Sequence, residues 1–371
     1  MNKKYLPSAL ILYLNYFIHG VGCSILGQAV IKEALAASWG VEVMAITAIS
    51  AALGLGRLIA LPFAGPLSDK LGRRISTAIG SGSYAIYLIG LALAFNAGTN
   101  GGYQIAYICA IVGGIANSFL DTGIYPAVSE IIYKAPGVAT MGIKFFISVS
   151  QMLLPFVLGV TVSTTATGAT SYNTLFYACG IVYLVLLVLV MIFPLPDTDQ
   201  KAAGKKEGLI DSLKHTHFSV ESIAMILIGF TCTGTFQLWL NCAQNFAKEN
   251  VGWADPSIMQ TYYSAGTMLA LVVTALLTRK IKDVRFILGY PVICLVTMIA
   301  VLVGKSQTLM IAGAFLIGWA GAGGLLQIAT SVCNMLFPKI KGTVTALVMI
   351  ASSLCNYTIL TAASKMQPSQ V

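Results

Sequence analysis

Four ionisable side chains interrupt long apolar stretches of this sequence, and their types suit proton exchange or anion binding. They are His19, Arg57, Asp121 and Lys144, all in the N-terminal half. An ionisable group in hydrocarbon costs at least about 2.5 to 3.5 kcal/mol, so such groups normally face a wet cavity or a charged partner. Helical rise puts Arg57 and Asp121 at similar depths of about 13 Å, with Lys144 shallower and His19 deeper. A shared polar layer is geometrically possible.

Each of the four residues has a functional role and a structural alternative. Asp121 is the only acid inside an apolar stretch, so it is the natural proton acceptor; the alternative is a static salt bridge to Arg57 or Lys144. His19 could relay a proton because imidazole titrates near neutral pH, or it could be a hydrogen-bonded packing residue. Arg57 and Lys144 could bind a carboxylate or phosphate, or they could serve as counter-ions, with Lys144 extending its amine to the membrane surface.

Neutral polar side chains in the apolar stretches are further candidates for substrate binding. Amide and hydroxyl groups can recognise a solute by hydrogen bonds, but they also join neighbouring membrane helices to each other. The candidates are Asn15, Asn117 and Gln151 in the N-terminal half, and Gln237, Asn241, Tyr263, Gln327 and Asn356 in the C-terminal half.

The composition shows which elements must position these residues. The chain is 57% apolar and only 9% charged, which cannot cover a water-facing surface and excludes a soluble fold. Apolar stretches of about 20 residues recur, the length that a helix needs to cross a bilayer. We expect membrane helices near residues 5–31, 42–64, 76–96, 103–130, 138–163, 172–194, 218–247, 257–278, 285–304, 308–337 and 342–364.

Cysteine spacing and charge exclude several partners. The eight cysteines lie singly in apolar stretches, without the spacing of a metal site, so we expect neither a metal nor another cofactor. The net charge of +9 comes from basic residues between the helices, where anionic lipid and the insertion machinery explain them, so we expect no nucleic-acid partner.

The basic residues also predict orientation. Most of the 22 lysines and arginines fall on one side if the N-terminus is cytoplasmic, which is the arrangement that membrane insertion favours. Lys32, Lys248, Lys305 and Lys365 are then expected in loops on the opposite side. The one long polar stretch, residues 196–217, is interpreted as a cytoplasmic linker between an N-terminal bundle, residues 1–195, and a C-terminal bundle, residues 218–371.

Three short sequence matches indicate that the second half is a degenerate copy of the first. Residues 28–33, QAVIKE, match residues 244–249, QNFAKE, at the ends of corresponding helices. Residues 67–71 match residues 277–281 at a similar offset, and Gly114 and Asn117 match Gly324 and Gln327. Two-fold duplication of this kind is typical of transporters.

The segment Gly65-Pro-Leu-Ser-Asp-Lys-Leu-Gly-Arg-Arg74 carries a recognisable pattern. It resembles the signature between helices 2 and 3 of the major facilitator superfamily, G-x-L-A-D-R-x-G-R-[KR], with conservative changes at Ser68 and Lys70. The resemblance implies an all-α membrane fold of two pseudo-symmetric six-helix bundles. The family normally has twelve helices, so either this sequence is truncated or its last helix is lost. The helix 4 arginine associated with drug/proton antiporters and the signatures of the sugar porters are absent.

The same segment suggests a conformational latch. Glycines permit a tight turn and close helix contact, and charged groups at the membrane face can separate and re-form contacts. The latch residues are Gly65, Asp69, Gly72, Arg73 and Arg74. By resemblance, Asp69 docks on the cytoplasmic end of the eleventh helix and stabilises the outward-facing state; the alternative is that these charges only determine topology.

The function expected from these features is secondary transport of a small solute. Three basic groups and one acid favour proton-coupled symport of a small organic anion or a sugar-like compound. Drug or metabolite efflux by antiport and a non-transporting sensor on the same scaffold are the alternatives. No enzyme motif such as G-x-S-x-G or H-E-x-x-H occurs, so we expect no enzymatic activity. The protein is expected to be a monomer in a bacterial inner membrane.

We predict that Asp69→Asn leaves membrane insertion intact but slows transport, because it removes the latch charge without adding bulk. The measurement is the transport rate of the inserted variant in proteoliposomes. A wild-type rate in a correctly inserted protein would rule the latch out.

Overall fold

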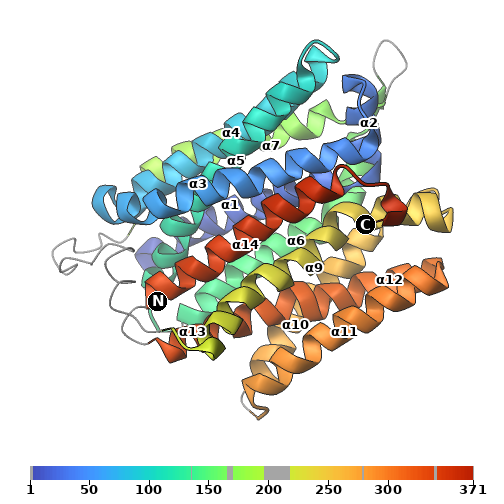
Figure 1. The fold of residues 1–371 in the computed structure, drawn as a ribbon. Helices are drawn as coiled ribbons and strands as arrows, with labels where there is room; N and C mark the ends of the chain where they lie inside the picture. The colour runs from blue at the N-terminus through green and yellow to red at the C-terminus, as the bar shows by residue number, and fades with distance from the viewer. Residues whose placement is uncertain are drawn as a thin grey trace. The chain divides into compact units, whose positions relative to one another are not determined.

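The computed structural model describes residues 3–134, 136–164, 170–195, 218–277, 280–337 and 341–370. They are almost entirely helical, apart from a hairpin of two short strands, β1 (Ser163–Thr164) and β2 (Thr170–Ser171). The chain divides into two compact units, Met1–Ala202 and Ala203–Val371, whose helices are coloured in chain order in Figure 1.

The first unit contains seven of the helices in the described part. Glycines end several of them: Gly40 ends α2 with a left-handed backbone, and Gly72, at φ +92°, forms the turn between α3 and α4. The helices are α1 (Leu6–Ser24), α2 (Ala29–Trp39), α3 (Thr47–Leu71), α4 (Arg73–Ala97), α5 (Gly102–Ile131), α6 (Pro136–Thr161) and α7 (Asn173–Ile192).

The described part of the second unit is also made of helices. Serine side chains cap two of its helices: Ser219 accepts a hydrogen bond from the backbone of Ser222, and Ser306 accepts one from the backbone of Leu309. Its elements are α9 (Val220–Val251), α10 (Met259–Leu277), α11 (Asp283–Gly304), α12 (Gln307–Ile317), the π-helix η4 (Gly318–Leu325), α13 (Leu326–Leu336) and α14 (Lys341–Ala363).

Ten helical segments of the described part are long and apolar enough to cross a membrane. These helices expose large apolar side chains, among them Val160, which is 87% exposed, and Val303, which is 77% exposed. Such faces are unstable in water but suited to lipid, in which helices satisfy their own backbone groups. The chain is therefore a multi-pass membrane protein, as the composition predicted. Each of the eleven expected helices has a counterpart, although α10 is not among the ten.

The predicted end of the first helix, residues 5–31, is wrong. Helix α1 stops at Ser24, a short 3-10 turn follows, and Gln28 is extended before α2 begins. Lys32 was expected in an exposed loop, but it is fully buried on α2 and donates a hydrogen bond of 2.7 Å to the Thr47 hydroxyl. The reason is that α2 packs against the 3-10 turn Val43–Ile46, which leads into α3, and against α4, so the chain after the first span is part of the core.

The corresponding segment of the second unit behaves differently. Helix α9 runs without interruption through Gln244 to Val251, so Lys248 lies on the helix rather than in the expected loop. Gln28 and Gln244 are both buried. The duplicated sequence therefore forms a break in one unit and a continuous helix in the other.

The expected helix at residues 308–337 is also interrupted. Its middle turns form the π-helix η4, which contains Gly318, Gly321, Gly323 and Gly324. Side chains bond to carbonyl groups of this wider helix: the Thr267 hydroxyl donates to Gly318 at 3.2 Å, and the Cys232 thiol donates to Gly321 at 3.1 Å. Such partners help to satisfy the altered backbone pattern of a π-helix.

Helices α3 and α5 approach each other closely near the charged residues. A Cβ atom on Gly56 would collide with the Ile111 carbonyl oxygen, and one on Gly114 would lie 2.7 Å from the backbone nitrogen of Arg57. Only glycine permits this backbone approach. The contact places Arg57, which follows Gly56, beside the middle of α5.

We predict that Gly56→Ala lowers the melting temperature of the purified protein, because the added methyl forces α3 away from α5. The expected loss is about 1 to 3 kcal/mol of stability, the usual cost of overpacking. The control is Gly82→Ala on α4, where the nearest atom to an added Cβ is 3.8 Å away. Equal melting temperatures for the two variants in the same detergent would contradict the close α3 to α5 contact.

Candidate functional site

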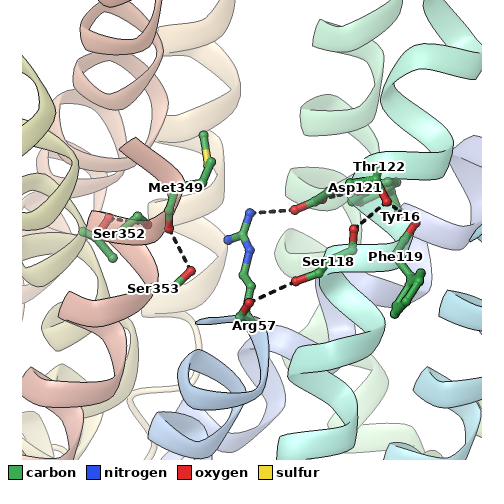
Figure 2. A network of polar contacts seen from close by, with 10 residues as sticks. Tyr16, Arg57, Ser118, Phe119, Asp121, Thr122, Met349, Ser352 and Ser353 are labelled. Atoms are coloured by element: carbon green, nitrogen blue, oxygen red, sulfur yellow. Dashed lines mark hydrogen bonds and ion pairs between the residues drawn. The ribbon is translucent and has the colours of Figure 1, made fainter. Parts of the chain in front are cut away.

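Arg57 on α3 and Asp121 on α5 form an ion pair in the first unit. Arg57 Nη2 lies 2.6 Å from Asp121 Oδ2, and about a quarter of each side chain is exposed. The Ser118 hydroxyl, one turn before Asp121, donates to the Arg57 carbonyl at 3.2 Å and joins the same two helices (Figure 2). The structure thus brings together the two residues that the sequence placed at similar depth, and it shows them paired.

The second oxygen of the Asp121 carboxylate is also engaged. The hydroxyl of Tyr16 on α1 donates a hydrogen bond to Asp121 Oδ1. Tyr16 is only 2% exposed. Figure 2 shows the carboxylate held between Arg57 and Tyr16.

His19 lies one turn beyond Tyr16 on α1. Its ring meets Tyr16 edge-on at 5.3 Å between centroids and Tyr84 at 5.2 Å. Its Nδ1 atom is buried and has no hydrogen-bond partner among the described residues. Three charged residues are close enough to interact electrostatically with the His19 ring: Asp121, Arg57 and Lys144.

Lys144 on α6 completes this group of residues. It is half-buried and lies near Tyr125, which follows Asp121 by one turn on α5. Tyr125 in turn meets Tyr16 edge-on at 5.7 Å. All four ionisable residues predicted from the sequence therefore belong to one cluster, which we call the charged cluster: His19, Arg57, Asp121 and Lys144, with Tyr16 and Tyr125.

Two of the predicted binding residues hold helices together in this structure. Asn15 is fully buried; it donates to the Ile11 carbonyl at 2.9 Å and accepts from the Ser81 hydroxyl at 2.7 Å. Gln151 is 6% exposed and donates to the Ser24 hydroxyl at 2.6 Å. These contacts join α1 to α4 and to α6, the structural alternative for neutral polar groups in membranes.

Asn117 differs from these two residues. It is half-buried, and its side-chain oxygen has no hydrogen-bond partner among the described residues. A buried amide oxygen without a partner is costly, so it is available for a solute or a water molecule.

The candidates of the second unit lie on four elements. Asn241 is buried and donates to the side chain and the carbonyl of Gln237, one turn earlier on α9, at 3.1 and 3.0 Å. Tyr263 on α10 is buried, and the side-chain oxygen of half-buried Asn356 on α14 has no partner among the described residues. The side chain of Gln327 lies outside the described residues.

The segment 65–74 forms the end of α3 and the turn into α4. Arg73 donates to the Ser68 hydroxyl at 3.1 Å, and Arg74 donates to the Phe193 carbonyl beyond α7 at 3.4 Å. Gly72 makes the expected tight turn, and a Cβ added at Gly65 would meet no atom within 4 Å among the described residues. The Asp69 side chain lies outside the described residues, so the latch stays a prediction.

Sequence reasoning missed the two tyrosines of the charged cluster. Residues three or four apart share a helix face, and this spacing relates Tyr16 to His19 and Tyr125 to Asp121. That spacing was the available signal. Fifty-seven per cent of the chain is apolar or aromatic, however, so a tyrosine at helical spacing does not stand out.

The arrangement defines a class of protein: two units of membrane-spanning helices, one of which holds a partly exposed cluster of charges. The family model of the Major Facilitator Superfamily matches residues 12–356. The chain belongs to this superfamily, which confirms the resemblance seen in residues 65–74 and the expected fold class.

Curated relatives are similar over most of their length. The uncharacterized MFS-type transporter YfkL of Bacillus subtilis (strain 168) is 32% identical over 96% of this chain and 88% of that protein. The inner membrane transport protein YdiM of Escherichia coli (strain K12) is 30% identical over 97% of this chain and 87% of that protein. The chain is therefore a superfamily transporter.

Solved structures share the fold at low sequence identity. A D-xylose-proton symporter superimposes with a TM-score of 0.75 at 17% identity, covering 98% of this chain and 90% of that one. The nucleoside transporter NupG superimposes with a TM-score of 0.72 at 13% identity, covering 96% and 90%.

We predict that Arg57→Leu destabilises the protein more than the double variant Arg57→Leu with Asp121→Leu. The single change leaves a carboxylate without its counter-ion, at a cost of about 1 to 2 kcal/mol, below the ~3–5 kcal/mol of a fully buried pair because both side chains are partly exposed. The measurement is a double-mutant cycle of thermal unfolding in detergent. Additive losses would mean that the pair has no energetic coupling.

Proposed function

We propose that this protein is a secondary transporter that couples proton movement to symport of a small organic anion or a sugar-like compound by alternating access. The observation that carries the proposal is the Arg57–Asp121 ion pair at 2.6 Å, with each side chain about one-quarter exposed. Partial exposure allows water to reach a carboxylate that otherwise lies among helices.

The ion pair provides a means of coupling. While Asp121 is ionised, it neutralises Arg57. Protonation of Asp121 removes that charge and leaves the guanidinium with a net positive charge, which a substrate carboxylate can then neutralise with two parallel hydrogen bonds. Release of the proton restores the internal pair and expels the anion. One proton and one anion therefore move together.

His19 and Lys144 support the same reading. Both lie in the charged cluster with Arg57 and Asp121, so protonation of Asp121 leaves a site of positive charge. The Nδ1 atom of His19 is buried and has no hydrogen-bond partner among the described residues, which makes His19 a second proton-carrying candidate. Asn117, Gln237, Asn241, Tyr263, Gln327 and Asn356 are the proposed hydrogen-bonding residues.

The relatives support transport and a bacterial inner membrane. YdiM is named an inner membrane transport protein, and the neighbouring structures include a symporter of D-xylose with protons and a nucleoside transporter. The bias of basic residues supports a cytoplasmic N-terminus. Docking of Asp69 on the eleventh helix would stabilise the outward-facing state.

A proteoliposome screen tests the proposal. The purified protein is reconstituted with an imposed pH gradient and offered radiolabelled monocarboxylates, dicarboxylates and neutral monosaccharides such as D-xylose. Accumulation that collapses with a protonophore supports symport. Export driven by the same gradient would indicate the efflux alternative, and uptake of every solute at the rate of empty liposomes would indicate a protein that does not transport this class.

We predict that Asp121→Asn abolishes pH-driven accumulation of the solute found in the screen while preserving its binding and its exchange across the membrane. Asparagine has nearly the shape of protonated aspartate, so the site stays in its substrate-binding form and cannot release the proton. Counterflow and gradient-driven uptake are measured on the same vesicles. Concentrative uptake at the wild-type level would remove Asp121 from the mechanism and leave His19 as the remaining candidate.

A further inference from the structure

The Tyr16 hydroxyl contacts the reacting carboxylate directly, on the side opposite Arg57 (Figure 2). We propose that Tyr16 is the positioning residue that holds the Asp121 carboxyl group in place in both of its charge states and sets the pH at which it changes charge. The importance of Tyr16 for transport rests on the proposed function. Its effect on the protonation of Asp121 does not.

The argument begins with what each partner of Asp121 can do. A guanidinium has only donors, so Arg57 can bind the carboxylate but cannot accept a hydrogen bond from a carboxylic acid. A phenol has one donor and also accepts. Tyr16 is therefore the partner that can bond to Oδ1 in both charge states, because rotation of its O–H bond turns the donor into an acceptor without moving a heavy atom. Arg57 can only continue to donate to Oδ2, without the attraction of a full negative charge.

The proton step is simple to balance. A hydronium ion from the aqueous side gives its proton to Asp121 Oδ1 and leaves as water, which the partial exposure of the side chain permits. The new O–H bond of Asp121 donates to the Tyr16 oxygen, while Tyr16 keeps its own proton. The ion pair to Arg57 through Oδ2 loses its charge attraction, but the carboxyl group stays attached to α1.

The surroundings keep Tyr16 in position for this role. It is 2% exposed, and its ring is held edge-on by His19 on its own helix and by Tyr125 on α5. Three further charged or titratable groups lie nearby. Arg57 on α3 and Lys144 on α6 are members of the charged cluster, and Tyr84 on α4 lies against His19. None of these replaces Tyr16 at Oδ1 among the described contacts.

A purely structural role is the alternative, since the same hydrogen bond joins α1 to α5. Tyr183 on α7 offers a matched comparison. It is fully buried, and its hydroxyl donates to α1 at the carbonyl of Asn15, next to Tyr16, at 2.7 Å. Removing the Tyr183 hydroxyl takes a similar bond from the same helix without touching Asp121.

Infrared difference spectroscopy tests the proposal without any substrate. The carbonyl band of protonated Asp121 is identified as the band that disappears in Asp121→Asn, and its intensity is followed against pH in the wild type, Tyr16→Phe and Tyr183→Phe. Tyr16→Phe removes the hydrogen bond in both charge states, but the bond to the charged carboxylate is the stronger of the two, so the midpoint should rise by about one pH unit. The midpoint in Tyr183→Phe should stay at the wild-type value.

A second variant covers the case in which Tyr16→Phe fails to fold. Site-specific 3-fluorotyrosine at position 16 makes the phenol a stronger donor, so the midpoint should move to lower pH. An unchanged midpoint in Tyr16→Phe or the fluorotyrosine protein, or an equal shift in Tyr183→Phe, would overturn the proposal. A shifted midpoint in a protein that shows no pH-driven uptake would leave the role of Tyr16 intact and count against the proposed function instead.

Discussion

The cost of placing charge in hydrocarbon is the constraint on which the first unit depends. Arg57 and Asp121 can lie within the membrane-spanning helices because each is the other's counter-ion and the remaining carboxylate oxygen is bound by Tyr16. That arrangement requires α3 and α5 to approach more closely than side chains normally allow. Gly56 and Gly114 provide the approach. The packing of small residues and the chemistry of the charged cluster are therefore parts of one arrangement.

The partial exposure of the pair is what the proposed proton exchange requires. A fully enclosed pair would gain little by changing its charge state, because a proton would have no route to it. A fully exposed pair would be weak, since water screens it. With about a quarter of each side chain exposed, the pair is strong enough to hold two helices and still open to water, which suits a group that has to gain and lose a proton.

The two units share a helical plan but differ in chemistry. The first unit holds the charged cluster, whereas the candidates in the second unit are neutral amides and a tyrosine, such as Asn241 bonded to Gln237. The duplicated segment also diverges, with a break at Gln28 in one unit and a continuous α9 in the other. The two units therefore share a helical plan while their polar residues differ.

The amino-acid sequence by itself determined the approximate position and the membrane character of the helices, and the family. Apolar stretches of sufficient length have one stable form in lipid, because a helix satisfies its own backbone. It also singled out the ionisable residues, because charge is rare in such stretches and is expensive there.

Only the tertiary structure decided which of these residues meet and what they do to each other. Lys32 was expected in a loop but is buried, because α2 packs against the turn that leads into α3 and against α4. Neither the break at Gln28 nor the π-helix η4 interrupts the hydropathy pattern. Asn15 and Gln151 bond between helices, and Tyr16 binds Asp121. Hydropathy measures the preference of a side chain for water or for lipid. A hydrogen bond between helices depends on the positions of two atoms, and these positions are set by helix packing.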